Sequence, residues 1–152
     1  MNRTTVGGPD LGGGRGAGGV LVLVDPSGAG AGQVAALLAA RLHPSVHLRT
    51  DDFLRAIRNG NLPPEQPEAD RQNTTALAAT AQAAFAYATG GYQVVVESPA
   101  TPPTLDTFRR ESRTTGAALH YITLPTDPPD TPEATADAIL TSLPHRTHLL
   151  GW

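Results

Sequence analysis

Apolar and polar residues alternate in blocks along this chain, and the blocks predict an alternation of strands and helices. Short apolar runs rich in valine and leucine, typical of buried strands, occupy residues 20–24, 46–48, 92–97 and 118–124. Apolar residues at three- and four-residue spacing predict helices over 34–42, 50–57, 70–89, 105–113 and from 132 onward. We therefore expect an α/β fold, in which right-handed βαβ units build a parallel sheet of about four strands between two helix layers.

Composition divides the chain into a tail, a domain and a second tail. Residues 1–19 include the tract GGPDLGGGRGAGG, which has too little apolar surface to offset the entropy of ordering its backbone. We expect a disordered glycine-rich tail over 1–19, one domain over 20–143 and a C-terminal tail over 144–152. Glycines 14, 16 and 19 match a dinucleotide-binding spacing, but they precede a strand where that motif follows one.

The composition argues against several kinds of protein. The chain has 152 residues, 14 acidic and 11 basic side chains and a formal net charge of -3, so it offers no electrostatic footprint for nucleic acid. It contains no cysteine, which excludes disulfides and thiolate metal sites. No apolar run is long enough to span a membrane, and the first residues contain no hydrophobic signal core. We expect a cytoplasmic protein that binds neither membranes nor nucleic acid.

The glycine-rich turn between the first strand and the first helix is the strongest candidate site. Its sequence is DPSGAGAGQ over 25–33. In α/β proteins such a turn binds phosphate, because loop N–H groups and the positive end of the helix converge on an anion. The candidate cofactor-binding residues are Ser27, Gly28, Ala29, Gly30, Ala31, Gly32 and Gln33.

This turn matches the P-loop pattern G-x-x-x-x-G-K-[ST] in length but lacks the residues that perform its chemistry. Asp25 stands at the first glycine, Ala31 at the lysine and Gly32 at the serine or threonine. That lysine reaches the β- and γ-phosphates and the hydroxyl binds Mg²⁺, which alanine and glycine cannot do. The chain contains no lysine elsewhere to substitute, and the sequence indicates no metal ligand.

An acidic pair after the second strand has two interpretations. Thr50, Asp51 and Asp52 suit the start of a helix, where such side chains cap free N–H groups and complement the helix dipole. Asp51 is also a candidate catalytic base, since open α/β sheets place their ligands at the carboxyl ends of strands. Composition favours capping, and the catalytic interpretation stays open.

A series of short segments carries a resemblance to a known family. They are HLRTDDF at 47–53, AI at 56–57, NG at 59–60, PP at 63–64, PE at 67–68, QNT at 72–74, YA at 87–88, GGY at 90–92, VVV at 94–96, LD at 105–106, FR at 108–109 and HY at 120–121 before LP at 124–125. In this order they resemble bacterial P-loop small-molecule kinases, the AAA-family ATPase group with gluconate-kinase-like and chloramphenicol-phosphotransferase-like proteins. The resemblance covers 20–143 and implies a P-loop NTPase-like three-layer sandwich with strand order 2-3-1-4. It also implies a small-molecule ligand, ATP and Mg²⁺ as cofactors, and Asp51 as base toward a substrate hydroxyl.

Three departures distinguish this chain from that family. The phosphate loop lacks its lysine and hydroxyl, and the strand that ends in aspartate in the family ends here in Glu97-Ser98-Pro99. In addition, the segment LP at 124–125 runs almost directly into DPPDT at 127–131, which resembles the segment after the family's fifth strand. We expect the lid and the fifth strand to be missing, and with the lid the arginines that stabilise a transferring phosphoryl group.

The sequence leaves three functions open. The favoured one is a P-loop kinase-like protein with a degenerate loop, impaired catalysis and at most weak binding of nucleotide or anion. The second is an active ATP-dependent phosphotransferase in which Arg49 or Arg55 replaces the lysine. The third is a nicotinamide dinucleotide-binding protein, because Gly28-x-Gly30-x-Gly32 follows a strand and Asp51 lies where a ribose-binding acid belongs. No substrate or protein partner is indicated.

Overall fold

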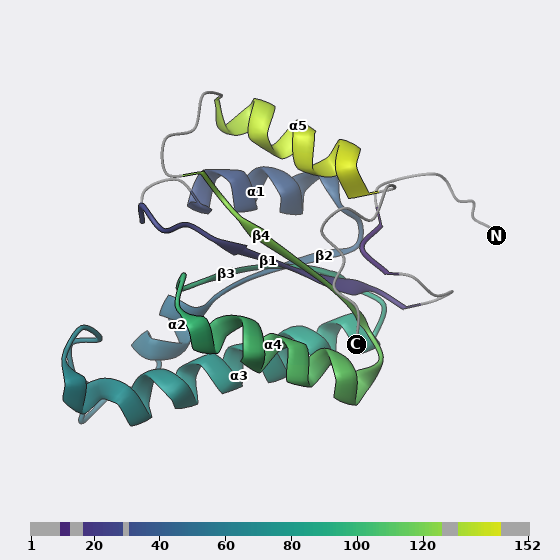
Figure 1. Ribbon diagram of the computed structural model, residues 1–152. Coiled ribbons are helices and arrows are strands. Elements are labelled where there is room, and N and C mark those ends of the chain that lie inside the picture. Colours follow the sequence, from purple (N-terminus) through teal and green to yellow (C-terminus); the bar gives the residue numbers. More distant parts are fainter. Residues whose placement is uncertain (1–9, 13–16, 29–30, 126–130, 144–152) are drawn as a thin grey trace.

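The computed structural model describes residues 10–12, 17–28, 31–125 and 131–143. Its centre is a four-stranded parallel sheet in the order β2-β3-β1-β4 (Figure 1). The strands are β1 (Gly19–Val24), β2 (Ser45–Arg49), β3 (Gln93–Ser98) and β4 (Ala118–Thr123). Both the parallel pairing and the strand order confirm the predicted topology.

Helices cover both faces of the sheet and complete the predicted three-layer sandwich. One face is covered by α1 (Ala31–Arg41) and α5 (Pro132–Ser142) (Figure 1). The other face carries α2 (Thr50–Arg55), the short 3₁₀ helix η1 (Pro67–Ala69), α3 (Asp70–Thr89) and α4 (Pro102–Thr115). Right-handed crossovers place helices on opposite faces when they run in opposite directions along the sheet. The connection from β1 to β2 runs one way, and those from β2 to β3 and from β3 to β4 run the other.

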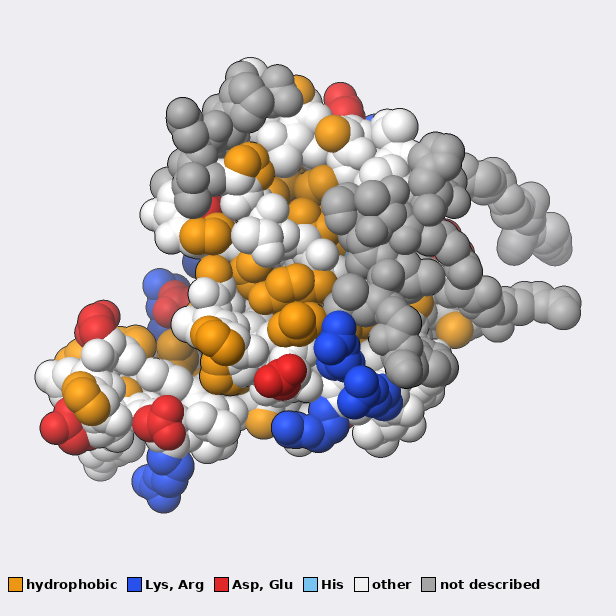
Figure 2. Space-filling model, in the orientation of Figure 1, with side chains coloured by type: hydrophobic (Ala, Val, Ile, Leu, Met, Phe, Trp, Pro, Cys, Tyr) orange, Lys and Arg blue, Asp and Glu red, His pale blue; other side chains and the backbone are white. Residues whose placement is uncertain are grey.

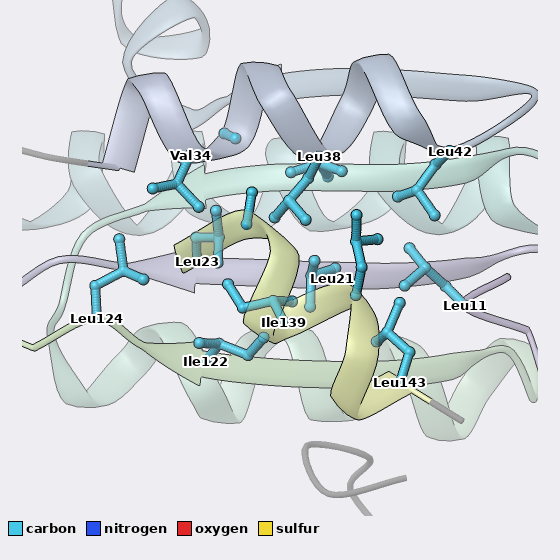
Figure 3. Close-up of a cluster of buried hydrophobic side chains, with 14 residues drawn as sticks. Leu11, Leu21, Leu23, Val34, Leu38, Leu42, Ile122, Leu124, Ile139 and Leu143 are labelled. Atoms are coloured by element: carbon cyan, nitrogen blue, oxygen red, sulfur yellow. The ribbon is translucent and has the colours of Figure 1, made fainter. Parts of the chain in front are cut away.

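Each face of the sheet has its own apolar core. Along β1, Leu21 and Leu23 face α1 and α5, whereas Val20 and Val22 face α3 and α4. Every residue of β1 is buried, because the strand is central and covered on both sides, and this explains its continuous apolar sequence. Figure 3 shows the first core, to which α1 contributes Val34 and Leu38 and α5 contributes Ile139.

Part of the segment before β1 packs onto the domain. Leu11 is 1% exposed and belongs to the core beneath α1 and α5. Its N–H donates to Oε1 of Gln93 at 2.8 Å, and its carbonyl accepts a hydrogen bond from Nε2 of His120 at 2.9 Å. Two buried side chains thus satisfy the backbone of Leu11, a residue that the sequence prediction assigns to the tail. Residues 1–9, 13–16 and 144–152 of the predicted tails lie outside the described residues.

The helix ends follow local chemistry that the sequence displays. Helix α3 spans the predicted residues 70–89, and α5 begins after Thr131, whose side chain accepts a hydrogen bond from the N–H of Ala134 at 3.2 Å. Helix α4 begins at Pro102, three residues before its predicted start, because the fixed φ of proline suits the first turn of a helix. Helix α1 likewise begins earlier than predicted, at Ala31.

The connection from β4 to α5 is short, as the predicted deletion requires. Helix α5 begins at Pro132, nine residues after β4 ends at Thr123, and residues 126–130 lie outside the described part of the chain. Over the residues that the structure does describe, the sheet has no fifth strand. The predicted four-strand fold is therefore confirmed.

Charged side chains mark two regions of the surface (Figure 2). Basic side chains gather over α4, where Arg110 and Arg113 are exposed. The start of α3 and the loop before it project from the sandwich and carry the exposed acids Glu65 and Glu68. No helix in the described residues has the length and apolar character needed to cross a membrane.

Candidate functional site

A cleft of about 460 Å³ lies at the carboxyl end of the sheet. The β1–α1 turn, the β2–α2 junction and the end of β3 line it. Strand order reverses between β1 and β3, and open α/β sheets bind ligands at this kind of switch point. The turn contributes Asp25, Gly28, Ala31 and Gly32, the junction contributes 49–51 and Leu54, and the end of β3 contributes 97–99.

Hydrogen bonds among residues 25–28 hold the first half of the glycine-rich turn in place. Oδ1 of Asp25 accepts from the N–H of Ser27 at 3.0 Å and from its hydroxyl at 2.6 Å. The N–H of Gly28 donates to the carbonyl of Asp25 at 3.0 Å, and Gly28 has φ 74°, a left-handed conformation that glycine adopts without strain. A bound anion would therefore compete with Asp25 for the N–H of Ser27.

Glu97 is the centre of an ion-pair cluster beside the cleft. His47 and Arg49 lie two residues apart on β2, and Arg49 is directly opposite Glu97 in the register of β2 and β3. Oε2 of Glu97 lies 2.6 Å from Nε2 of His47 and 3.7 Å from Nε of Arg49. A carboxylate only accepts hydrogen bonds, so the histidine donates through Nε2–H. The Glu97 side chain is only 17% exposed, which makes it the most buried of the three.

The hydroxyls of Thr50 and Ser98, which also line the cleft, join the ends of β2 and β3. Oγ1 of Thr50 and Oγ of Ser98 are 2.8 Å apart. The predicted capping hydrogen bond is wrong, because Arg49 is the N-cap of α2 and forms no side-chain hydrogen bond there. Asp51 and Asp52 do lie in the first turn of α2, as predicted for acids that complement the helix dipole. Asp51 is half exposed, lines the cleft and pairs with Arg55 at 2.8 Å. Its assignment as a base stays a prediction.

The structure brings together some of the predicted binding residues. Gly28, Ala31 and Gly32 line the cleft, whereas Ser27 and Gln33 are exposed and lie outside the lining set. Ala29 and Gly30 fall outside the described residues. Of the two arginines considered as lysine substitutes, Arg49 lines the cleft, but Arg55 pairs with Asp51 and Asp52 and is not part of the lining.

The residues of the cleft do not fit Mg²⁺-ATP in the way a P-loop holds it. A Cβ built on Gly32 would lie 3.6 Å from Oε1 of Glu97, so a hydroxyl here would adjoin a carboxylate, but glycine supplies none. In the described part of the chain, no three His, Asp or Glu side chains are grouped to hold a metal ion. Three carboxylates, of Asp25, Asp51 and Glu97, line the cleft together with one guanidinium, that of Arg49, and this excess of negative charge disfavours a polyphosphate.

Sequence reasoning missed the contact between His47 and Glu97. One signal was present: alternation along β2 places His47 and Arg49 on the same face, and the predicted strand order places β2 beside β3. The pairing still required the register, because a shift of one residue between the strands would turn these side chains to the other face.

No known protein family matches the sequence, and no curated protein matches it. Solved structures do. A point mutant of the Mycobacterium tuberculosis APS kinase CysC is similar with a TM-score of 0.64 and 22% identity, over 84% of this chain and 98% of that chain. The protein APE1195 is similar with a TM-score of 0.69 and 14% identity, over 86% of this chain and 97% of that one. The same APS kinase in complex with AMPPNP and APS gives a TM-score of 0.56 and 22% identity, over 86% and 73%.

Identities this low show the fold alone, a P-loop NTPase-like three-layer sandwich that this chain shares with the APS kinase structures. The sheet supports the same conclusion, because β3 lies between β1 and β2. In the dinucleotide-binding fold, the second strand lies directly beside the first. Strand order therefore speaks against the dinucleotide-binding alternative, although both folds place a glycine-rich turn after β1.

Proposed function

We propose that this protein is a P-loop kinase-like protein with impaired phosphoryl transfer that retains at most weak binding of an anion or nucleotide in the cleft. The observation that carries the proposal is the first turn of α1, where Ala31 and Gly32 line the cleft. These positions supply neither the cation for the β/γ-phosphates nor the hydroxyl for the metal.

Several contributions to transition-state stabilisation are missing together. Removing a single preorganised donor costs roughly 2.7–4 kcal/mol in well-studied enzymes. Here the loop lysine, the metal-binding hydroxyl and the lid are all absent from the sequence. Such losses are not additive, but each acts in the same direction. Asp51 is the proposed base, and a base contributes little when the phosphoryl group is not held in line.

Some capacity for anion binding supports the weaker half of the proposal. Backbone N–H groups at the start of α1 are free of intrahelical partners, and the helix dipole favours negative charge there. Arg49 adds a guanidinium to the cleft lining. We therefore expect phosphate, sulfate or ATP to bind with a Kd above about 1 mM and with no strong metal dependence.

Calorimetric titration with inorganic phosphate and with ATP, each with and without Mg²⁺, tests this function. Arg49→Gln should weaken the residual binding further, and Arg110→Gln on exposed α4 is the matched control. Micromolar, Mg²⁺-dependent ATP binding would contradict the proposal. Measured ATP turnover would instead support the alternative, an active phosphotransferase in which Arg49 replaces the lysine.

A further inference from the structure

We propose that Glu97 acts as an internal anion in this cleft: its carboxylate neutralises Arg49 and so disfavours the binding of polyanionic ligands. The inference rests on the proposed anion-binding function of the cleft, and it gives a cause for weak binding that is separate from the missing loop residues. Removing the charge of the Glu97 carboxylate by substitution tests this cause.

The position of the carboxylate carries the inference. Oε2 of Glu97 faces β2, at 2.6 Å from His47 and 3.7 Å from Arg49. Oε1 faces α1, 3.6 Å from the point that a Cβ on Gly32 would occupy. The carboxylate thus lies between the arginine of the cleft and the first turn of α1, the two features that would attract an anion.

The other charges of the cleft leave Arg49 as the group for which a ligand must compete. Arg49 is the only basic residue among those that line the cleft in the described chain. Of the two other carboxylates in the lining, Asp51 is paired with Arg55 at 2.8 Å, and Asp25 accepts hydrogen bonds from the N–H and hydroxyl of Ser27. Glu97, at 17% exposure, is shielded from solvent, so its field is screened less than that of an exposed acid. An anion that approaches Arg49 is therefore attracted weakly, because the charge of Arg49 is already balanced by Glu97. The same anion must also approach the Glu97 carboxylate, which repels it.

His47 makes the block persistent. The Arg49 side chain is 46% exposed, so it can turn toward a ligand, but the hydrogen bond from His47 holds Glu97 in place without it. An entering anion then shares Arg49 with a carboxylate that does not leave. His47 is thus a positioning residue that acts through Glu97.

The test is Glu97→Gln, which keeps the shape of the side chain and removes its charge. Inorganic phosphate and Mg²⁺-free ATP are titrated by calorimetry at low salt into the full chain. We expect both to bind at least about tenfold more tightly than to the parent protein, with a gain that shrinks as salt is added. The control Glu65→Gln removes one acid from an exposed loop outside the cleft and should change neither affinity.

A double variant assigns the gain to its cause. Arg49→Gln combined with Glu97→Gln should lose the gain, because the freed guanidinium is what binds the anion. Affinity of Glu97→Gln within about twofold of the parent, or a gain that survives in the double variant, would overturn the inference. If circular dichroism shows that Glu97→Gln does not fold, Glu97→Ala is used in its place. Acetate then supplies the missing carboxylate and should compete with phosphate for Arg49.

The outcomes separate this inference from the proposed function. Weak phosphate binding that is equal in the parent and in Glu97→Gln overturns the inference and leaves the proposed function standing. Binding in neither protein overturns the inference and leaves the proposed function standing, because that function requires at most weak binding. Micromolar, Mg²⁺-dependent ATP binding by the parent protein overturns the proposed function. Tighter binding in Glu97→Gln supports both.

Discussion

The backbone N–H of Leu11 donates a hydrogen bond to Oε1 of Gln93 at 2.8 Å, across 82 positions of sequence. Gln93 is the first residue of β3 and is 5% exposed, so its amide has little access to water. Through this contact a residue from a glycine-rich segment becomes part of the core at the end of the sheet opposite the cleft.

Replacing Gln93 by leucine should lower the free energy of unfolding by about 1–3 kcal/mol, because the N–H of Leu11 loses its partner in a buried place. Urea denaturation measures the change. Gln82→Leu, on an exposed position of α3, is the matched control and should have little effect. Equal stability of Gln93→Leu and the parent would show that this hydrogen bond does not hold the segment.

Leu11→Ala should lower the free energy of unfolding by about 2–5 kcal/mol, since it removes a fully buried side chain and leaves a cavity. The same truncation at Leu62, which is 37% exposed, should cost less than about 1 kcal/mol. Thermal or urea unfolding distinguishes the two. A loss at Leu11 no larger than that at Leu62 would mean that the segment detaches without cost to the domain.

Restoring the loop residues should recover nucleotide binding without efficient transfer. The variant Ala31→Lys with Gly32→Ser returns the cation and the metal-binding hydroxyl, and a side chain at 32 has room, with its nearest neighbour 3.6 Å from the new Cβ. Asp25→Gly is added in a second version to remove the competing carboxylate. ATP affinity by calorimetry, with and without Mg²⁺, should improve in both.

Turnover by the same variants should stay low, because the proposed function assumes no lid to exclude water and donate arginines. Robust phosphorylation of a small hydroxyl compound would show that the lid is dispensable. ATP binding that stays undetectable in every restored variant would contradict the predicted recovery.

Stability at alkaline pH should depend on Tyr121. Burial raises the pKa of the Tyr121 phenol above its ordinary value of 10.0, because the charged phenolate is poorly solvated there. The pKa of Tyr121 is higher in the folded state than in the unfolded state. Its contribution to stability is therefore complete below about pH 10 and is lost as the pH rises through the folded pKa. Tyr121→Phe removes this loss, so the stability of the parent relative to the variant should fall above pH 10.0.

The matched control for that measurement is Tyr87→Phe, at a tyrosine that is 44% exposed. The free energy of unfolding is measured from pH 8 to about 11 for the parent, for Tyr121→Phe and for Tyr87→Phe. A parent and a Tyr121→Phe variant whose stabilities run parallel over this range would contradict the prediction.

Most of the fold could be predicted because its signals are local. The valine run of β3 favours a strand where it lies, and the glycines after α3 favour the end of that helix. Thr131 and Pro132 favour a helix start at the position where α5 begins. Such features depend on neighbours within one turn of helix or one strand, so the sequence is enough to predict them. Strand order came from the resemblance, and the structure confirms it.

The sequence by itself also determined what the phosphate loop lacks, because alanine and glycine carry no cation and no hydroxyl in any fold. Only the tertiary structure decided what fills the cleft instead. His47 and Glu97 are 50 positions apart, and Thr50 and Ser98 are 48 apart. These pairs form only when β2 and β3 lie side by side in one register, which the packing of both faces of the sheet imposes and no local pattern encodes.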